Sequence, residues 1–122
     1  MRTDRRVQGR VVEDAACAYL QRAGLALLAR NVDCRYGELD LVMRDGEEIV
    51  FAEVRYRAGT SRGGAPASVD RRKQGRVASA ARWYLAGRRE LASAPCRFDV
   101  LAVSGEPPYR IAWLRDAFRP ED

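Results

Sequence analysis

The sequence contains no histidine, and Lys73 is its only lysine. The absence of histidine excludes imidazole acid–base catalysis, histidine-dependent catalytic triads and zinc sites built from cysteine and histidine. Any metal ion must therefore be bound mainly by carboxylates, which favours Mg²⁺ or Mn²⁺. The three cysteines, Cys17, Cys34 and Cys96, do not have metal-ligand spacing, and we expect them to be free thiols.

Long apolar segments are also missing. No apolar run approaches the ~20 residues that a transmembrane helix needs. The polar, basic residues 1–10 lack the apolar region of a secretory signal. We therefore expect a cytoplasmic protein with no membrane partner. With 122 residues, 47% of them hydrophobic, the chain suits a single domain over residues 1–122.

The net charge is +5, and arginine supplies nearly all of the positive charge. Arginine binds phosphate oxygens through a planar fork of N–H donors, so a basic domain suggests a polyanionic partner. The alternative is that arginine simply replaces lysine on solvated faces. One predicted helix carries four basic residues close together, namely Arg71, Arg72, Lys73 and Arg76. They form either a phosphate-contacting stripe or a solvated helix face.

The periodicity of apolar residues predicts the element order α-β-β-β-α-β-β. Helices are expected over residues 10–23 and 70–85, and strands over residues 25–30, 37–44, 48–57, 98–103 and 109–114. We therefore expect an α/β fold in which a mixed sheet is flanked by two helices.

Several local features refine this prediction. Residues 1–9 are expected to be a basic lead-in, and the Gly- and Pro-rich residues 58–67 a mobile loop. Trp83 and Trp113 are interpreted as core residues. Alternation along the strand over residues 37–44 predicts three apolar side chains on one face, namely Leu39, Leu41 and Met43.

Two acidic residues lie on neighbouring predicted strands. The Asp45-Gly46 turn predicts an antiparallel hairpin, and counting outwards from this turn places Asp40 and Glu53 at similar heights. Opposed Cβ atoms would be ~5 Å apart, a separation at which two carboxylates can share one divalent ion. Because Glu53 lies in an otherwise apolar strand, its charge needs a cation nearby.

Other charged residues belong near this pair. Side chains two apart in a strand share a face, which puts Glu38 beside Asp40 and Arg55 beside Glu53. Glu13, at the margin of the first helix's apolar stripe, is a further acid that can join the cluster. The same residues allow an alternative, in which an ion-pair network around Arg55 stabilises the strand pair without catalysis.

The segments Gly37-Glu38-Leu39-Asp40-Leu41 and Phe51-Ala52-Glu53-Val54-Arg55 resemble motifs of the YraN-like proteins. These are small predicted endonucleases related to Holliday-junction resolvases within the PD-(D/E)xK superfamily. The resemblance extends over most of the chain and includes residues 9–13, 29–31, 73–74 and 97–100. It implies a restriction-endonuclease-like core and metal-dependent phosphodiester cleavage.

The resemblance also implies roles for individual residues. Asp40 and Glu53 match the metal-binding carboxylates, and Glu13 matches the first-helix acid that often completes such sites. The motif lysine that orients or activates the attacking water is replaced here by Arg55. Arginine can hold a phosphate but cannot readily act as a base, because a guanidinium releases its proton only far above ordinary pH. Lys73 is another source of an ammonium group.

Two hypotheses follow for the function. The first is a Mg²⁺- or Mn²⁺-dependent endonuclease acting on branched or structured DNA, with Asp40, Glu53 and Arg55 as catalytic residues. Its contacts with the DNA backbone are then expected from Arg57, Arg62, Lys73 and Arg76. The second is a nucleic-acid-binding module that keeps the nuclease fold without turnover, because Arg55 replaces the lysine. A scaffold for another DNA-processing protein and a homodimer are open alternatives.

Overall fold

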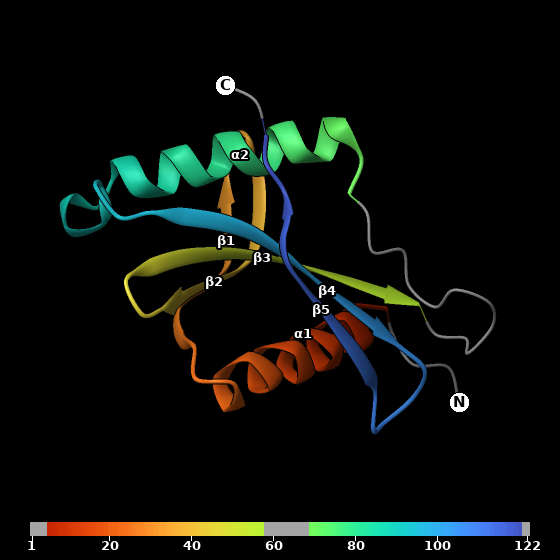
Figure 1. Ribbon diagram of the computed structural model, residues 1–122. Helices are drawn as coiled ribbons and strands as arrows, with labels where there is room; N and C mark the ends of the chain where they lie inside the picture. The colour runs from red at the N-terminus through yellow and green to blue at the C-terminus, as the bar shows by residue number, and fades with distance from the viewer. Residues whose placement is uncertain (1–4, 58–68, 121–122) are drawn as a thin grey trace.

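The computed structural model of the protein describes residues 5–57 and 69–120 (Figure 1). In chain order the elements are α1 (Arg5–Arg22), β1 (Ala26–Cys34), β2 (Gly37–Asp45), β3 (Glu48–Arg57), α2 (Arg71–Ala86), the 3₁₀ helix η1 (Arg89–Leu91), β4 (Cys96–Ser104) and β5 (Arg110–Phe118). The five strands form one mixed sheet in the order β1-β2-β3-β4-β5. The predicted α/β class and element order are confirmed.

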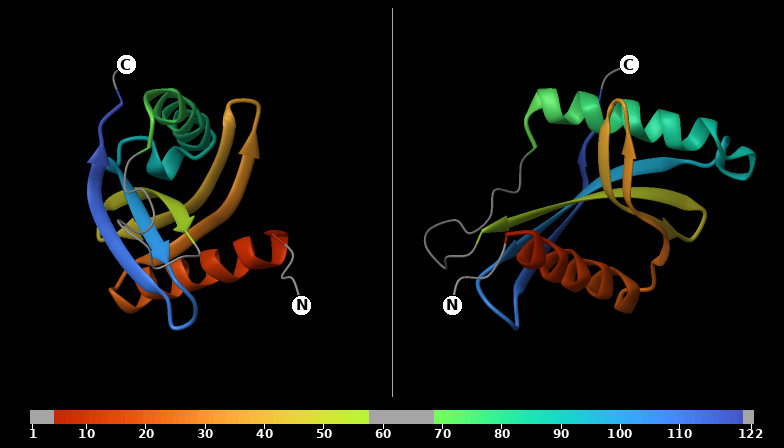
Figure 2. Two further views of the ribbon diagram at one scale, coloured as in Figure 1. Left: turned by 90° about the vertical axis from the view of Figure 1, so that its right-hand side faces the viewer. Right: turned by 180° about the vertical axis from the view of Figure 1, so that it is seen from behind.

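The sheet lies between the two long helices, with α2 on one face and α1 on the other (Figures 1 and 2). β3 and β4 run parallel with α2 between them in the chain, whereas the other neighbouring strands are antiparallel. β3 supplies both apolar cores. Ile49 and Phe51 pack on the α2 side and Val50 and Ala52 on the α1 side, as period-2 alternation predicts.

The helix ends follow local signals in the sequence. α2 begins after Asp70, whose side chain accepts a hydrogen bond from the backbone N–H of Lys73 (2.8 Å) and so caps the first turn. α1 begins at Arg5, earlier than the predicted residue 10. Its first turns are attached to the sheet, because Gln8 Nε2 donates to the Tyr56 hydroxyl at 3.2 Å. Residues 5–9 are therefore helical rather than an irregular lead-in.

Alternation along β2 breaks at Asp40. Leu41 and Met43 lie in the apolar cluster on the α1 side, but Leu39 lies in the cluster on the α2 side together with Val42. The prediction that Leu39 shares a face with Leu41 and Met43 is therefore wrong. A regular strand cannot place Leu39 and Leu41 on opposite faces, because side chains two residues apart point the same way.

The break has its origin on both strands of the β1–β2 hairpin. Cα pairing runs through Arg30↔Leu41 and resumes at Val32↔Leu39, so Asn31 faces Asp40. Asn31 has a φ of 50°, in the left-handed region that asparagine tolerates better than most residues. The end of the hairpin is rotated as a result, and its apolar side chains pack under α2.

The two tryptophans differ. Trp113 is half-buried and packs edge-on against Tyr19, with ring centroids 6.3 Å apart. Trp83 is 46% exposed, so its interpretation as a core residue is wrong. The buried face of α2 consists of Val77, Ala78, Ala80, Ala81 and Tyr84. Trp83 lies outside that arc.

Among the described residues, none of the helices is long and apolar enough to cross a membrane. All three cysteines are free, as predicted. The predicted loop over residues 58–67 lies outside the described residues.

A buried aspartate joins β4 to β5 at the far end of the sheet. Asp99 has no exposed surface and accepts hydrogen bonds from Arg97 Nε (3.0 Å), Trp113 Nε1 (2.9 Å) and the backbone N–H of Asp116 (2.9 Å). Arg97 also forms an ion pair with Glu48 at 2.7 Å. A buried carboxylate with a full set of donors is a structural element of the fold.

We expect Asp99→Ala to lower the free energy of unfolding by about 3 kcal/mol or more, because it leaves several buried donors without an acceptor. Urea denaturation followed by circular dichroism measures this change. Asp33→Ala, at an exposed aspartate of β1, is the matched control and should stay within about 0.5 kcal/mol of the wild type. Equal effects of the two substitutions would contradict the structural role of Asp99.

Candidate functional site

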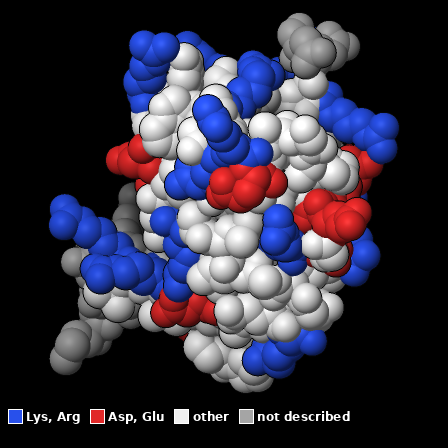
Figure 3. Space-filling model, turned by 90° about the vertical axis from the view of Figure 1, so that its left-hand side faces the viewer, with Lys and Arg blue, Asp and Glu red and all other residues white. Residues whose placement is uncertain are grey.

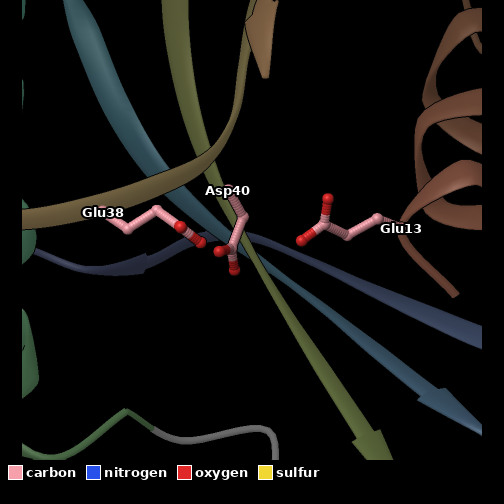
Figure 4. Close-up of side chains that lie close together, drawn as sticks. All are labelled: Glu13, Glu38 and Asp40. Carbon is pink, nitrogen blue, oxygen red and sulfur yellow. The ribbon is translucent and has the colours of Figure 1, made fainter. Parts of the chain in front are cut away.

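Acidic side chains from α1 and β2 converge on one place (Figure 4). Glu13, Glu38 and Asp40 each bring a carboxylate oxygen to within 4.8 Å of the others. Figure 4 shows Glu38 and Glu13 approaching Asp40 from opposite sides. Glu38 is exposed, whereas Glu13 and Asp40 are half-buried. A set of carboxylate oxygens at this spacing suits a hard divalent cation such as Mg²⁺ or Mn²⁺.

Asp40 lies where β2 separates from β3. Backbone pairing of the two strands runs from Asp45↔Glu48 out to Leu41↔Ala52. Beyond that pair, a side-chain hydrogen bond replaces the backbone pairing, because Asp40 Oδ2 accepts from the backbone N–H of Val54 at 2.9 Å. The backbone N–H of Asp40 in turn donates to Glu53 Oε2 at 3.5 Å. The two acids are therefore neighbours, as counting from the turn predicts.

Glu53 is only 1% exposed and is paired with a cation from α2. Lys73 Nζ lies 3.7 Å from Glu53 Oε1. That separation makes an ion pair but is longer than a hydrogen bond, and Oε1 has no hydrogen-bond partner in the described part of the chain. Among the described residues, Arg55 forms no ion pair. The alternative of an ion-pair network around Arg55 is therefore not found in this part of the chain, and the cation that neutralises Glu53 is Lys73.

Arg30 of β1 neutralises the other side of the cluster. Its guanidinium forms an ion pair with Glu13 at 3.5 Å and a shorter one with Asp14 at 2.8 Å. Glu13 Oε1 is nevertheless buried without a hydrogen-bond partner among the described residues. Because Arg30 is shared with Asp14, the converging acids keep an excess of negative charge.

This excess and the burial change how the acids titrate. Burial, followed by the charge of Glu53, raises the pKa of Asp40 from 3.8 to about 8. Burial also raises the pKa of Glu53, and the ammonium of Lys73 partly offsets that effect. A divalent cation would favour the ionised form of both groups, so metal binding and proton release are coupled here.

The residues predicted to contact nucleic acid lie at different places. Arg57 is exposed at the end of β3, Arg76 is exposed one helical turn after Lys73, and Arg62 lies outside the described residues. On the face shown in Figure 3, basic side chains are interspersed with acidic ones. Charge alone therefore marks no single nucleic-acid surface on that face.

The structure settles the place of two residues that the sequence leaves open. The sequence puts Glu38 beside Asp40 but not among the predicted metal ligands, whereas its carboxylate belongs to the group of three acids. Lys73 is expected either to contact DNA or to supply an ammonium group, and its Nζ lies 3.7 Å from Glu53 Oε1. The available signal for Lys73 was that it is the only lysine in the chain.

We expect the metal-free protein to lose stability as the pH rises from about 4 to about 8. Over this window the unfolded chain has released the Asp40 proton, whereas the folded protein, with its pKa raised to about 8, retains it. Asp40→Asn removes this titration. At pH 8 it should be more stable than the wild type by on the order of 1 kcal/mol or more, with a much smaller difference at pH 4.

Urea denaturation in EDTA at the two pH values checks this expectation. Glu47→Gln, at an exposed acid of the β2–β3 turn, is the control and should change stability little at either pH. An effect of Asp40→Asn that is the same at pH 4 and pH 8 would contradict the raised pKa.

Comparison with known proteins gives the relationship of this chain to others. The model of the "Uncharacterised protein family UPF0102" matches residues 12–103, which include all four acids of the site. The UPF0102 protein of Xanthomonas campestris pv. campestris (strain B100) is 54% identical over 118 residues, covering 97% of this chain and 96% of the relative. Relatives from Xylella fastidiosa (strain M12) and Pseudomonas savastanoi pv. phaseolicola (strain 1448A / Race 6) are 51% and 47% identical, each over 119 residues. They cover 98% and 96% of this chain, and 98% and 97% of the respective relative. The chain therefore belongs to the UPF0102 protein family.

Proposed function

We propose that the protein is a Mg²⁺- or Mn²⁺-dependent endonuclease that hydrolyses phosphodiester bonds in branched or structured DNA, with the core of the PD-(D/E)xK superfamily. The observation that supports this most is the group of acids at the separation of β2 and β3. Glu13 and Glu38 meet Asp40, and Glu53 is hydrogen-bonded to the backbone of Asp40. Like charges held this close are costly unless a cation offsets them.

The donor set fits such a cation. Every ligand atom on offer is a carboxylate oxygen, and the chain contains no histidine to direct the site towards zinc. Glu13 and Glu53 each have a buried oxygen without a hydrogen-bond partner among the described residues. Asp40 would be the central ligand, with Glu13 and Glu38 beside it. Glu53, predicted from the sequence as a ligand, lies outside this group of three and adjoins Asp40 through the backbone N–H of Asp40. When bound, the ion supplies positive charge that acidifies a water molecule and offsets phosphate charge.

In this proposal Lys73 and Arg55 each take one part of the role that the motif lysine has in the resembling family. Arg55 holds the phosphate, because the planar fork of guanidinium N–H donors matches phosphate oxygens. Lys73 brings an ammonium group from α2 to 3.7 Å from Glu53. It favours the ionised form of Glu53 and places a second positive charge beside the scissile phosphate. Arg57 and Arg76 contact the DNA backbone further away.

A second candidate function is a DNA-binding module that keeps this fold without turnover. The residue that favours it is Arg55, which stands where the resembling motif has a lysine. This candidate predicts binding that weakens steeply with salt, because phosphate contacts release counterions. It also predicts that Mn²⁺ produces no cleavage.

We expect the wild type to cleave a four-way junction or a flap in the presence of Mn²⁺, and Asp40→Asn to reduce the rate on the order of 100-fold or more. Loss of a central carboxylate removes charge stabilisation of the bound ion. Gel assays with junction, flap and linear duplex measure the rates, and Glu47→Gln should cleave like the wild type. Equal cleavage by wild type and Asp40→Asn would indicate a contaminating nuclease and contradict the proposal.

Metal binding gives an independent check of the site. Mn²⁺ at 100-fold over its dissociation constant should stabilise the wild type by about 2.7 kcal/mol, and Asp40→Asn should lose most of this gain. Lys73→Met should bind Mn²⁺ as tightly as the wild type or more tightly, because a competing ammonium is gone, yet cleave more slowly. Thermal denaturation with increasing Mn²⁺ measures binding, and Arg72→Met, at an exposed neighbour, is the control. Weaker Mn²⁺ binding by Lys73→Met would contradict the assigned role of Lys73.

A further inference from the structure

Two exposed aromatic side chains share a surface pocket away from the acidic cluster. Tyr36, at the tip of the β1–β2 hairpin, is 36% exposed, and Trp83, on α2, is 46% exposed. Together with Ser79, Arg82 and Ala86 they line a pocket of about 420 Å³. Large aromatic groups at the surface are costly to leave in water, so a shared aromatic pocket indicates a binding site.

The pocket depends on the rotated end of the hairpin. Val32 and Cys34 pack into the apolar cluster under α2. At Gly37 an added Cβ would lie 3.6 Å from the Cβ of Arg76, so the hairpin tip lies directly against the helix. Figure 2 shows the hairpin reaching α2 in both views. The break at Asp40 therefore brings Tyr36 to Trp83.

The surroundings of the two rings are basic. The Arg35 guanidinium lies 4.8 Å from the centre of the Tyr36 ring and donates to its hydroxyl at 2.6 Å. Arg82 lines the pocket, and the described lining contains no acidic residue. Arg76 is exposed next to the hairpin tip. This combination of aromatic faces and guanidinium groups suits nucleobases joined by phosphates.

The pocket and the acidic cluster are connected through two elements. Tyr36 directly precedes β2, and Asp40 follows it by four residues, a span of ~13 Å at strand spacing. Along α2, Lys73 and Trp83 are ten residues apart, or ~15 Å at helical rise. A strand of nucleic acid at the cluster can therefore reach the aromatic pocket within a short distance.

We propose that the pocket between Tyr36 and Trp83 binds unpaired nucleobases by stacking. This inference rests on the proposed function, and it adds the class of substrate. The protein takes nucleic acid in which an unpaired strand lies next to the cleaved bond, such as a flap or an opened junction arm. A continuous duplex cannot use the pocket, since its bases are already stacked inside the helix.

The test measures binding in EDTA, where no cleavage occurs, by fluorescence anisotropy at one fixed salt concentration. The probes are a single-stranded DNA oligonucleotide, an abasic strand of the same length and charge, and a hairpin duplex. We expect wild type to bind the single strand about tenfold more tightly than the abasic strand. Trp83→Ala should abolish this ratio and leave duplex binding unchanged. Trp83→Phe should restore most of it, because phenylalanine still stacks.

Leu28→Ala, at another exposed apolar residue, is the matched control and should bind every probe like the wild type. The comparison of normal and abasic strands uses the wild-type protein alone, so it holds even where a variant folds poorly. Equal binding of these two strands by wild type would overturn the inference. A change in oligomeric state with Trp83→Ala, without any change in DNA binding, would also overturn it and assign the pocket to a protein contact.

These outcomes are separable from those of the proposed endonuclease activity. Base-dependent binding through Trp83 without any Mn²⁺-dependent cleavage would support the pocket and contradict the endonuclease. Cleavage that depends on Asp40, with no preference for bases over abasic sites, would support the endonuclease and overturn the pocket. An RNA strand of the same sequence, run beside the DNA, shows which nucleic acid the pocket accepts.

Discussion

The separation of β2 from β3 at Asp40 is the constraint on which the rest of the site depends. Where the backbone ladder ends, the freed N–H of Val54 is bound by the Asp40 carboxylate, and the N–H of Asp40 faces Glu53. Two acids are thus held where the two strands separate: Asp40 is half-buried and Glu53 is almost fully buried. Their burial raises the pKa of both, because a buried carboxylate is costly to ionise, and a bound divalent cation would lower that cost.

The two buried acids Asp99 and Glu53 differ in how well their carboxylate oxygens are hydrogen-bonded. Asp99 accepts hydrogen bonds from Arg97, Trp113 and the backbone of Asp116, so its burial is fully compensated. Glu53 is as deeply buried, yet one of its oxygens has only a lysine at 3.7 Å. Buried polar groups in stable folds are normally satisfied. An under-satisfied carboxylate next to Asp40 is consistent with the proposed cation site.

One backbone irregularity also connects the acidic cluster with the aromatic pocket. The left-handed Asn31 faces Asp40 across the β1–β2 hairpin, and past this point the side chains of both strands turn towards α2. The same rotation leaves Glu38 near Asp40 and Glu13, and Tyr36 near Trp83. A single break in a hairpin therefore determines both where a cation would be held and where bases would stack.

The sequence by itself determined the order of the two long helices and five strands, because each of them has a local cause. The Asp45-Gly46 turn defined the β2–β3 hairpin and, by counting, the proximity of Asp40 and Glu53. Period-2 alternation assigned the faces of β3, and apolar periodicity placed the start of α2 within one residue. Only the tertiary structure decided which cation meets Glu53, since Lys73 comes from a helix distant in the chain. It also decided that Glu38 joins the cluster and that Trp83 is exposed. These depend on a strand break and on helix placement, which arise from packing between elements and leave no periodic signal in the chain.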